Sequence, residues 1–143
     1  MTGFNMSEWV ARPPKEVFDF IAASENAPKI VNSVTSMVKL TDGPPRVGTR
    51  YRETRLMNGK EQQVELEIVE FEPTWKYAMQ NVTEGIETVY RYNFKSEKDG
   101  TRIDLVCEVK AKGIKKLMLP LVVFILKKED GDHLQRVKKV LEE

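Results

Sequence analysis

Glu53 and Arg55 have the clearest chemical potential in this sequence, because they alternate with Tyr51 along an apparent strand. Side chains two residues apart on a strand point to the same face of its sheet. On an inner face these charges could pair with each other or hold the polar end of a ligand, and a one-residue bulge would turn both into water. No catalytic residue is expected, because Glu53 is the one candidate general base and has no obvious second group.

Three tyrosines, Tyr77, Tyr90 and Tyr92, fall on the same expected face of the sheet. A buried phenol needs a hydrogen-bond partner, so three on one face make it polar for an ordinary core. Ligand pockets combine apolar walls with a few placed polar groups. We therefore expect at least one of these tyrosines to contact a ligand; alternatively, their hydroxyls reach the rim or the backbone.

Two other reactive side chains have simpler interpretations. Cys107 lies in an alternating stretch and is expected to be a small buried hydrophobic residue rather than a reactive thiol. His133 lies in KKEDGDHLQRV, among charged residues, and is expected to be exposed on a helix. The chain does not cluster the ligands that a metal site needs, so neither a metal nor another cofactor is expected.

The composition narrows the class of protein. The 143 residues include 23 Lys plus Arg and 22 Asp plus Glu, a net charge of +1, and 41% are hydrophobic. This balance favours one globular domain over residues 1–143 and argues against a nucleic-acid-binding protein, which needs a basic surface. A single cysteine excludes an intramolecular disulfide and suits a reducing compartment. The opening residues show no secretory signal, so a cytoplasmic location is expected.

Alternating hydrophobicity predicts that most of the chain forms an antiparallel sheet. The dipeptides Asn58-Gly59 and Asp99-Gly100 are strong hairpin signals between alternating stretches. Because hydrophobic and polar residues alternate, one face of the sheet needs a cover. The strands are expected in Phe4–Ala11, Val34–Leu40, Gly48–Met57, Gln62–Phe71, Lys76–Asn81, Ile86–Ser96 and Thr101–Lys112.

Two short helices are expected after the first strand. Pro14 fits a first helical position, and Val17, Phe18 and Ile21 recur at helical spacing, so they should face inward. Ser24 is expected to cap the second helix.

A long helix is expected in 113–143, as the cover of the sheet. Apolar residues recur at helical spacing from Ile114 to Ile125 and again from Leu134 to Leu141. Pro120 and Gly131 predict a kink or an uneven first half. Six or seven antiparallel strands, two short helices and this cover make an α+β layer fold.

The run Leu117–Leu126, LMLPLVVFIL, is apolar around the whole helix, which is more than one core-facing stripe requires. It is about half as long as a bilayer-spanning helix, which needs roughly 20 residues. The extra apolar side could pack on the bent sheet or form a homodimer contact. It could also touch a membrane while the flanking Lys115, Lys116, Lys127 and Lys128 meet anionic lipid.

The order of these segments resembles the SRPBCC superfamily of START, birch-pollen-allergen-like and polyketide cyclase/dehydrase-like proteins. The strings WVARPPKEVFDFIA, SENAPKIV, DGPPRVGTRYRET, EIVEFEP, DGTRIDL and LPLVVFILKKEDGDHLQRVKKVLEE carry the resemblance over nearly the whole chain. It implies a helix-grip fold, in which a strongly bent sheet grips the last helix around an apolar cavity. Members bind lipids, sterols, polyketides, quinones or hormones, and a minority are enzymes. They share no catalytic signature, so no catalytic residue transfers.

The cavity that this fold implies would be lined by inward strand residues and by one face of the long helix. We expect its ligand-binding residues to be Tyr51, Glu53, Arg55, Leu66, Tyr77, Met79, Tyr90, Tyr92, Leu105, Cys107, Leu117, Leu121, Phe124 and Ile125. An ordinary packed core is the alternative for the aliphatic members of this set.

Three functions are compatible with this cavity. The leading hypothesis is binding of one small, mostly hydrophobic ligand such as a lipid, polyketide or quinone. The second is a cyclase or dehydratase that acts on a polyketide-like substrate in the same cavity without metal or cofactor. The third is a membrane-surface or protein-partner module that uses the apolar helix 117–126 from outside.

Overall fold

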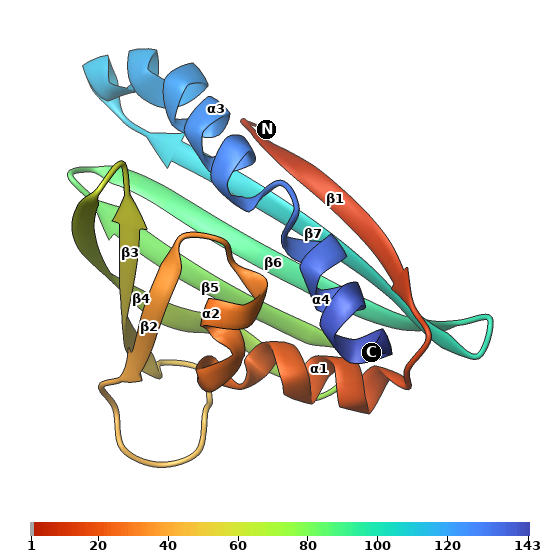
Figure 1. Cartoon of the computed structure of the whole chain (residues 1–143). Coiled ribbons are helices and arrows are strands. Elements are labelled where there is room, and N and C mark those ends of the chain that lie inside the picture. Colours follow the sequence, from red (N-terminus) through yellow and green to blue (C-terminus); the bar gives the residue numbers. More distant parts are fainter. Residues whose placement is uncertain (1) are drawn as a thin grey trace.

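The computed structural model describes residues 2–143 and is built on a seven-stranded antiparallel sheet (Figure 1). The strand order is β1-β7-β6-β5-β4-β3-β2, so each strand from β2 to β7 pairs with its neighbours in sequence, and β1 lies beside β7. The strands are β1 (Gly3–Val10), β2 (Val34–Lys39), β3 (Arg50–Met57), β4 (Lys60–Glu72), β5 (Lys76–Thr83), β6 (Ile86–Glu97) and β7 (Gly100–Ala111).

These strands confirm the predicted sheet and its hairpins. Asn58 and Gly59 have φ angles of 52° and 75°, as the mirror-image turns of two-residue hairpins require. Strands β2 and β3 cross β6 and β7 at a steep angle, so the sheet is strongly bent (Figure 1). A register shift between Ile68 and Glu70 interrupts the β4–β5 pairing, and such bulges increase local twist.

The connection from β1 to β2 contains α1 (Pro14–Ala22), a 3₁₀ turn η1 (Ser24–Asn26) and α2 (Ala27–Ile30). Phe18 of α1 is buried and meets the rings of Phe71, Tyr77 and Phe94 edge to face. The inward face predicted for α1 is therefore confirmed. The predicted cap is wrong, because Ser24 begins the 3₁₀ turn and makes no capping hydrogen bond through its side chain.

The C-terminal cover is helical but divided, as its proline and glycine predict. It consists of a 3₁₀ segment η2 (Gly113–Met118), α3 (Leu119–Asp130) and α4 (His133–Glu142). Pro120 lies in the first turn of α3, where its missing N–H breaks no helical hydrogen bond. A Cβ at Gly131 would lie 2.4 Å from the Lys127 carbonyl oxygen, so only glycine fits this close bend. The bend separates α3 from α4 (Figure 1).

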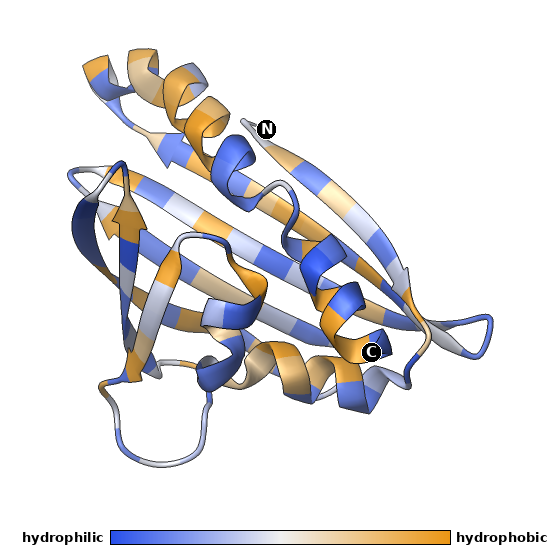
Figure 2. Ribbon diagram, viewed as in Figure 1, coloured by the Kyte–Doolittle hydropathy of each residue, from blue (hydrophilic) through white to orange (hydrophobic). Residues whose placement is uncertain are grey.

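The core has two parts, one under each half of this cover. In the larger part, α1 and α4 pack on the sheet through residues such as Val17, Leu134 and Val137. In the smaller part, Phe4, Cys107 and Val109 are buried and pack against the inner side of α3, formed by Leu119, Val122, Val123 and Leu126. In Figure 2, hydrophobic colour dominates α3 but alternates with hydrophilic colour along α4. No helix among residues 2–143 is long and apolar enough to span a bilayer.

Candidate functional site

A cavity of about 380 Å³ lies between the inner face of the bent sheet and the helices. Strands β2 to β6 form its wall, and residues of α1, α2, α3 and α4 cover it. The structure brings the following predicted residues to this cavity: Tyr51, Glu53, Arg55, Leu66, Tyr77, Met79, Tyr90, Tyr92 and Ile125. The strand positions that alternation assigned to the inner face are therefore largely right.

Two predicted cavity residues on β7 lie in the packed core instead. Leu105 and Cys107 are 1% and 0% exposed and do not line the cavity. Leu105 belongs to the larger part of the core and Cys107 to the smaller part, next to Phe4. Alternation along β7 identifies the inner face but does not show where helices already fill the space above it. Cys107 is the small buried residue that was expected, and burial raises the pKa of its thiol to about 12.

Three predicted cavity residues of the C-terminal cover face outward. Leu117, Leu121 and Phe124 are 79%, 57% and 66% exposed, so this part of the prediction is wrong. The prediction extrapolated α-helical spacing from Ile114 to Ile125. The first six residues instead form a 3₁₀ segment with fewer residues per turn, which changes the rotational phase of everything that follows.

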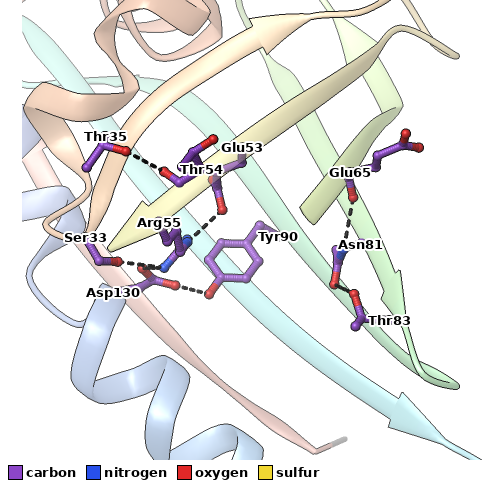
Figure 3. A network of polar contacts seen from close by, with 10 residues as sticks. All are labelled: Ser33, Thr35, Glu53, Thr54, Arg55, Glu65, Asn81, Thr83, Tyr90 and Asp130. Carbon is purple, nitrogen blue, oxygen red and sulfur yellow. Dashed lines mark hydrogen bonds and ion pairs between the residues drawn. The ribbon is translucent and has the colours of Figure 1, made fainter. Parts of the chain in front are cut away.

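A buried cluster of charged side chains forms the polar part of the cavity wall (Figure 3). The Arg55 Nε donates to Glu53 Oε1 at 2.6 Å, and its Nη1 donates to Asp130 Oδ1 at 3.1 Å and to Ser33 Oγ at 3.3 Å. The Tyr90 hydroxyl donates to the other carboxylate oxygen of Asp130. We call Glu53, Arg55, Tyr90 and Asp130 the polar cluster. Of the alternatives for Glu53 and Arg55, pairing inside the protein is confirmed.

The polar cluster places two carboxylates around one guanidinium. Glu53 and Asp130 are only 5% and 2% exposed, so bulk water solvates neither carboxylate well. Burial acts to lower the pKa of Arg55, but the charges of Glu53 and Asp130 outweigh it and raise that pKa above its usual value. Burial, followed by the charge of Asp130, raises the pKa of Tyr90 well above its usual value. The cluster therefore presents a permanent cation and a neutral phenol beside the cavity.

His133 is a second polar contact between helix and sheet, and its predicted exposure is wrong. It is 3% exposed and lines the cavity. Its Nδ1 lies 2.8 Å from the Ile30 carbonyl oxygen, and its Nε2 lies 2.8 Å from the Tyr92 hydroxyl. A carbonyl can only accept, so the proton is on Nδ1 and the Tyr92 hydroxyl donates to Nε2. Burial lowers the pKa of His133, which keeps this neutral form.

Asp130 and His133 are the site residues that the sequence reasoning missed. Their charged surroundings, KKEDGDHLQRV, suggested a solvated stretch. A signal was nevertheless present for His133, which precedes Val137 by four residues and so shares the face of buried residues on α4. Asp130 is the last residue of α3, and the bend at Gly131 hides its position from helical spacing. Within residues 2–143, no group of three or more His, Cys, Asp or Glu side chains is arranged to hold a metal ion.

Several solved structures are similar to this chain. The crystal structure of Ara h 8.0201 has a TM-score of 0.79 at 18% identity, covering 97% of this chain and 96% of that one. TTHA0849 from Thermus thermophilus has a TM-score of 0.76 at 17% identity, covering 96% and 95%. The di-domain ARO/CYC BexL from the BE-7585A biosynthetic pathway has a TM-score of 0.80 at 17% identity. That match covers 99% of this chain and 47% of the BexL chain.

These identities are low, so the structural likeness shows a shared fold. By sequence, no curated protein matches significantly. The family model described as "Polyketide cyclase / dehydrase and lipid transport" matches residues 1–142. With its bent sheet and divided C-terminal helix, the chain therefore belongs to this family, which confirms the SRPBCC-type fold that the sequence resembles.

Proposed function

We propose that the protein binds one small, mostly hydrophobic molecule in the cavity between sheet and helices. The observation that carries this proposal is the cavity itself, whose volume of about 380 Å³ lies within the range of small-molecule pockets, roughly 300–1,000 Å³. An ordinary packed core has few voids larger than a water molecule. An apolar guest would gain free energy from leaving water, on the order of 25 cal/mol per Å² of buried area.

The polar cluster supports a ligand with one polar end. Apolar side chains, including Leu66, Met79 and Ile125, form much of the wall, whereas Arg55 and Tyr90 are gathered at one place on it. A carbonyl or hydroxyl of the ligand directed at this place would meet Arg55, whose side chain is 18% exposed and is the most accessible charged side chain of the cluster. The expected ligand-contacting roles of these residues stay predictions.

Cavity filling provides the direct test. A Leu66→Trp variant places a large ring in the cavity, and Leu56→Trp makes the same substitution at an exposed position of β3 that does not line the cavity. We expect the wild type to bind the neutral probe N-phenyl-1-naphthylamine saturably, with a rise in its fluorescence. Leu66→Trp should weaken this binding about tenfold or more, because the cavity volume is occupied. Leu56→Trp should bind as the wild type does.

Two outcomes of this titration would contradict the proposal. One is a wild-type protein that shows no saturable probe binding and no co-purifying mass in native mass spectrometry. The other is equal binding by wild type and Leu66→Trp, because the probe would then occupy a different surface. Thermal melting of both tryptophan variants shows whether either has unfolded.

The cyclase or dehydratase hypothesis stays a prediction. Glu53, its one candidate base, is held by Arg55, and Tyr90 is held by Asp130, so both groups of the described site are engaged inside the protein. Peripheral membrane contact and a homodimer were expected as possible uses of the apolar helix, and a cytoplasmic location was expected because the sequence shows no secretory signal. These also stay predictions.

A further inference from the structure

Six apolar side chains of the C-terminal cover are exposed to solvent. They are Ile114, Leu117, Met118, Leu121, Phe124 and Ile125, which we call the outer apolar face. Their exposed fractions run from 40% for Ile125 to 81% for Ile114. They lie opposite Leu119, Val122, Val123 and Leu126, which pack on the sheet. The segment is therefore apolar on two sides, and within residues 2–143 one of them packs on the sheet while the other is exposed. Hydrophobic colour accordingly covers most of α3 in Figure 2.

Positive charge flanks the outer apolar face at both ends. Lys115 and Lys116 lie near its start, and Lys127 and Lys128 follow its last residue. Between Gly113 and Lys128 there is no Asp or Glu. The whole chain has a net charge of only +1, so this segment is a local concentration of positive charge. Apolar residues with lysines on either side are typical of helices that lie in the interface of an anionic bilayer.

The outer apolar face also adjoins the cavity. Ile125 belongs to the face and lines the cavity as well. At the other end of the segment, the Lys115 side chain lies 3.5 Å from where a Cβ of Gly85 would be, so η2 is beside the β5–β6 turn. The neighbours of Gly85 in that turn, Glu84 and Ile86, also line the cavity. A surface that touches the outer apolar face thus lies beside residues that line the cavity.

We propose that the outer apolar face docks the protein on an anionic lipid bilayer, with the four lysines against the headgroups. A second copy of the chain fits this face less well, because a symmetric contact would bring two sets of four lysines together without acidic partners in the same segment. Docking does not depend on the ligand proposed above. Transfer of that ligand between bilayer and cavity would rest on both proposals, because docking would bring the cavity close to the membrane surface.

Vesicle co-sedimentation tests the docking with substitutions at exposed positions, which leave the packing of the core unchanged. Phe124→Asp changes the centre of the outer apolar face, and Val47→Asp makes a similar change in the exposed loop before β3. We expect wild type to partition onto phosphatidylcholine vesicles with about 30% phosphatidylserine at least tenfold more strongly than onto phosphatidylcholine alone. Phe124→Asp should weaken partitioning about tenfold or more, and Val47→Asp should not. A Lys116→Glu/Lys127→Glu double variant should lose the preference for phosphatidylserine.

The other outcomes overturn the proposal. No partitioning of the wild type at low salt, or the same partitioning for Phe124→Asp, would rule out docking through this face. A dimer in sedimentation velocity that Phe124→Asp dissociates, without vesicle binding by the wild type, would assign the face to a second copy of the chain. Because the assay contains no probe for the cavity, its failure leaves the probe titration as an independent test of ligand binding.

Discussion

Arg55 is the residue on which the polar cluster depends. Its guanidinium is the one cation in contact with both Glu53 and Asp130, at 2.6 Å and 3.1 Å, within the part of the chain that the structure describes. A buried charge that loses its partner is strongly destabilising, whereas an intact buried pair adds little to stability relative to apolar residues. The cluster is therefore better explained by what it presents to the cavity than by the stability it gives.

An Arg55→Met variant should be destabilised by about 3–5 kcal/mol, because two carboxylates would stay buried without a cation. Arg52→Met is the matched control, since Arg52 lies on the same strand with its side chain exposed to solvent. The control should change the free energy of unfolding by less than about 0.5 kcal/mol. Urea denaturation measures both. If Arg55→Met is as stable as the control, the carboxylates do not need Arg55 and the cluster does not have the charge balance described here.

Three residues of the polar cluster could be predicted from the sequence. Strand alternation placed Glu53, Arg55 and Tyr90 on the inner face, and no bulge in β3 reversed them. It could not identify Asp130 as their partner, because Asp130 and Arg55 are 75 residues apart in the chain. Such a contact depends on where the last helix crosses the sheet, which local periodicity does not contain.

Among the elements, hairpins were the most predictable and helix phase the least. The turn at Asn58-Gly59 fixes the register of β3 against β4 locally, within a few residues. The orientation of α3 depends on how η2 ends, and a small change of turn geometry there rotates the whole helix. In a helix that is apolar on all sides, such as Leu117–Leu126, the hydrophobic pattern does not indicate which side faces the sheet and which faces solvent.

A matched pair of phenylalanines tests the observed orientations of α1 and α3. Both Phe18 and Phe124 were expected to face inward, but Phe18 is 2% exposed and Phe124 is 66% exposed. Phe18→Ala should lower the free energy of unfolding by about 3–5 kcal/mol, because it leaves a cavity among three aromatic rings. Phe124→Ala should change it by less than about 0.5 kcal/mol. Comparable losses for the two variants would mean that α3 is rotated relative to the orientation described here.

For the molecule as a whole, the C-terminal cover is connected to the sheet at two polar points beside the cavity. One is the contact of Asp130 with Arg55 and Tyr90, and the other is the contact of His133 with Tyr92. His133 also binds the Ile30 carbonyl of α2, so it joins three elements that are distant in sequence. These polar contacts hold the helices where hydrophobic packing is interrupted by the cavity.

The His133 contact predicts that stability decreases in mild acid. The pKa of His133 is lowered by burial in the folded protein, so below pH 6.5 the unfolded chain binds a proton that the folded protein does not. Stability is therefore complete above that pH and decreases as the pH falls. His133 should account for at most about 2 kcal/mol of loss between pH 7 and pH 5. Protonation would also place a second donor against the Tyr92 hydroxyl in a buried site.

Denaturation of wild type and His133→Asn at both pH values isolates this contribution from that of the carboxylates. Asparagine can still donate to the Ile30 carbonyl oxygen but does not titrate. The variant should be less stable at pH 7, because the Tyr92 hydroxyl loses its acceptor, yet it should lose less stability on acidification than the wild type. Parallel pH profiles for the two proteins would contradict the prediction, because His133 would then bind its proton equally well in the folded and the unfolded protein.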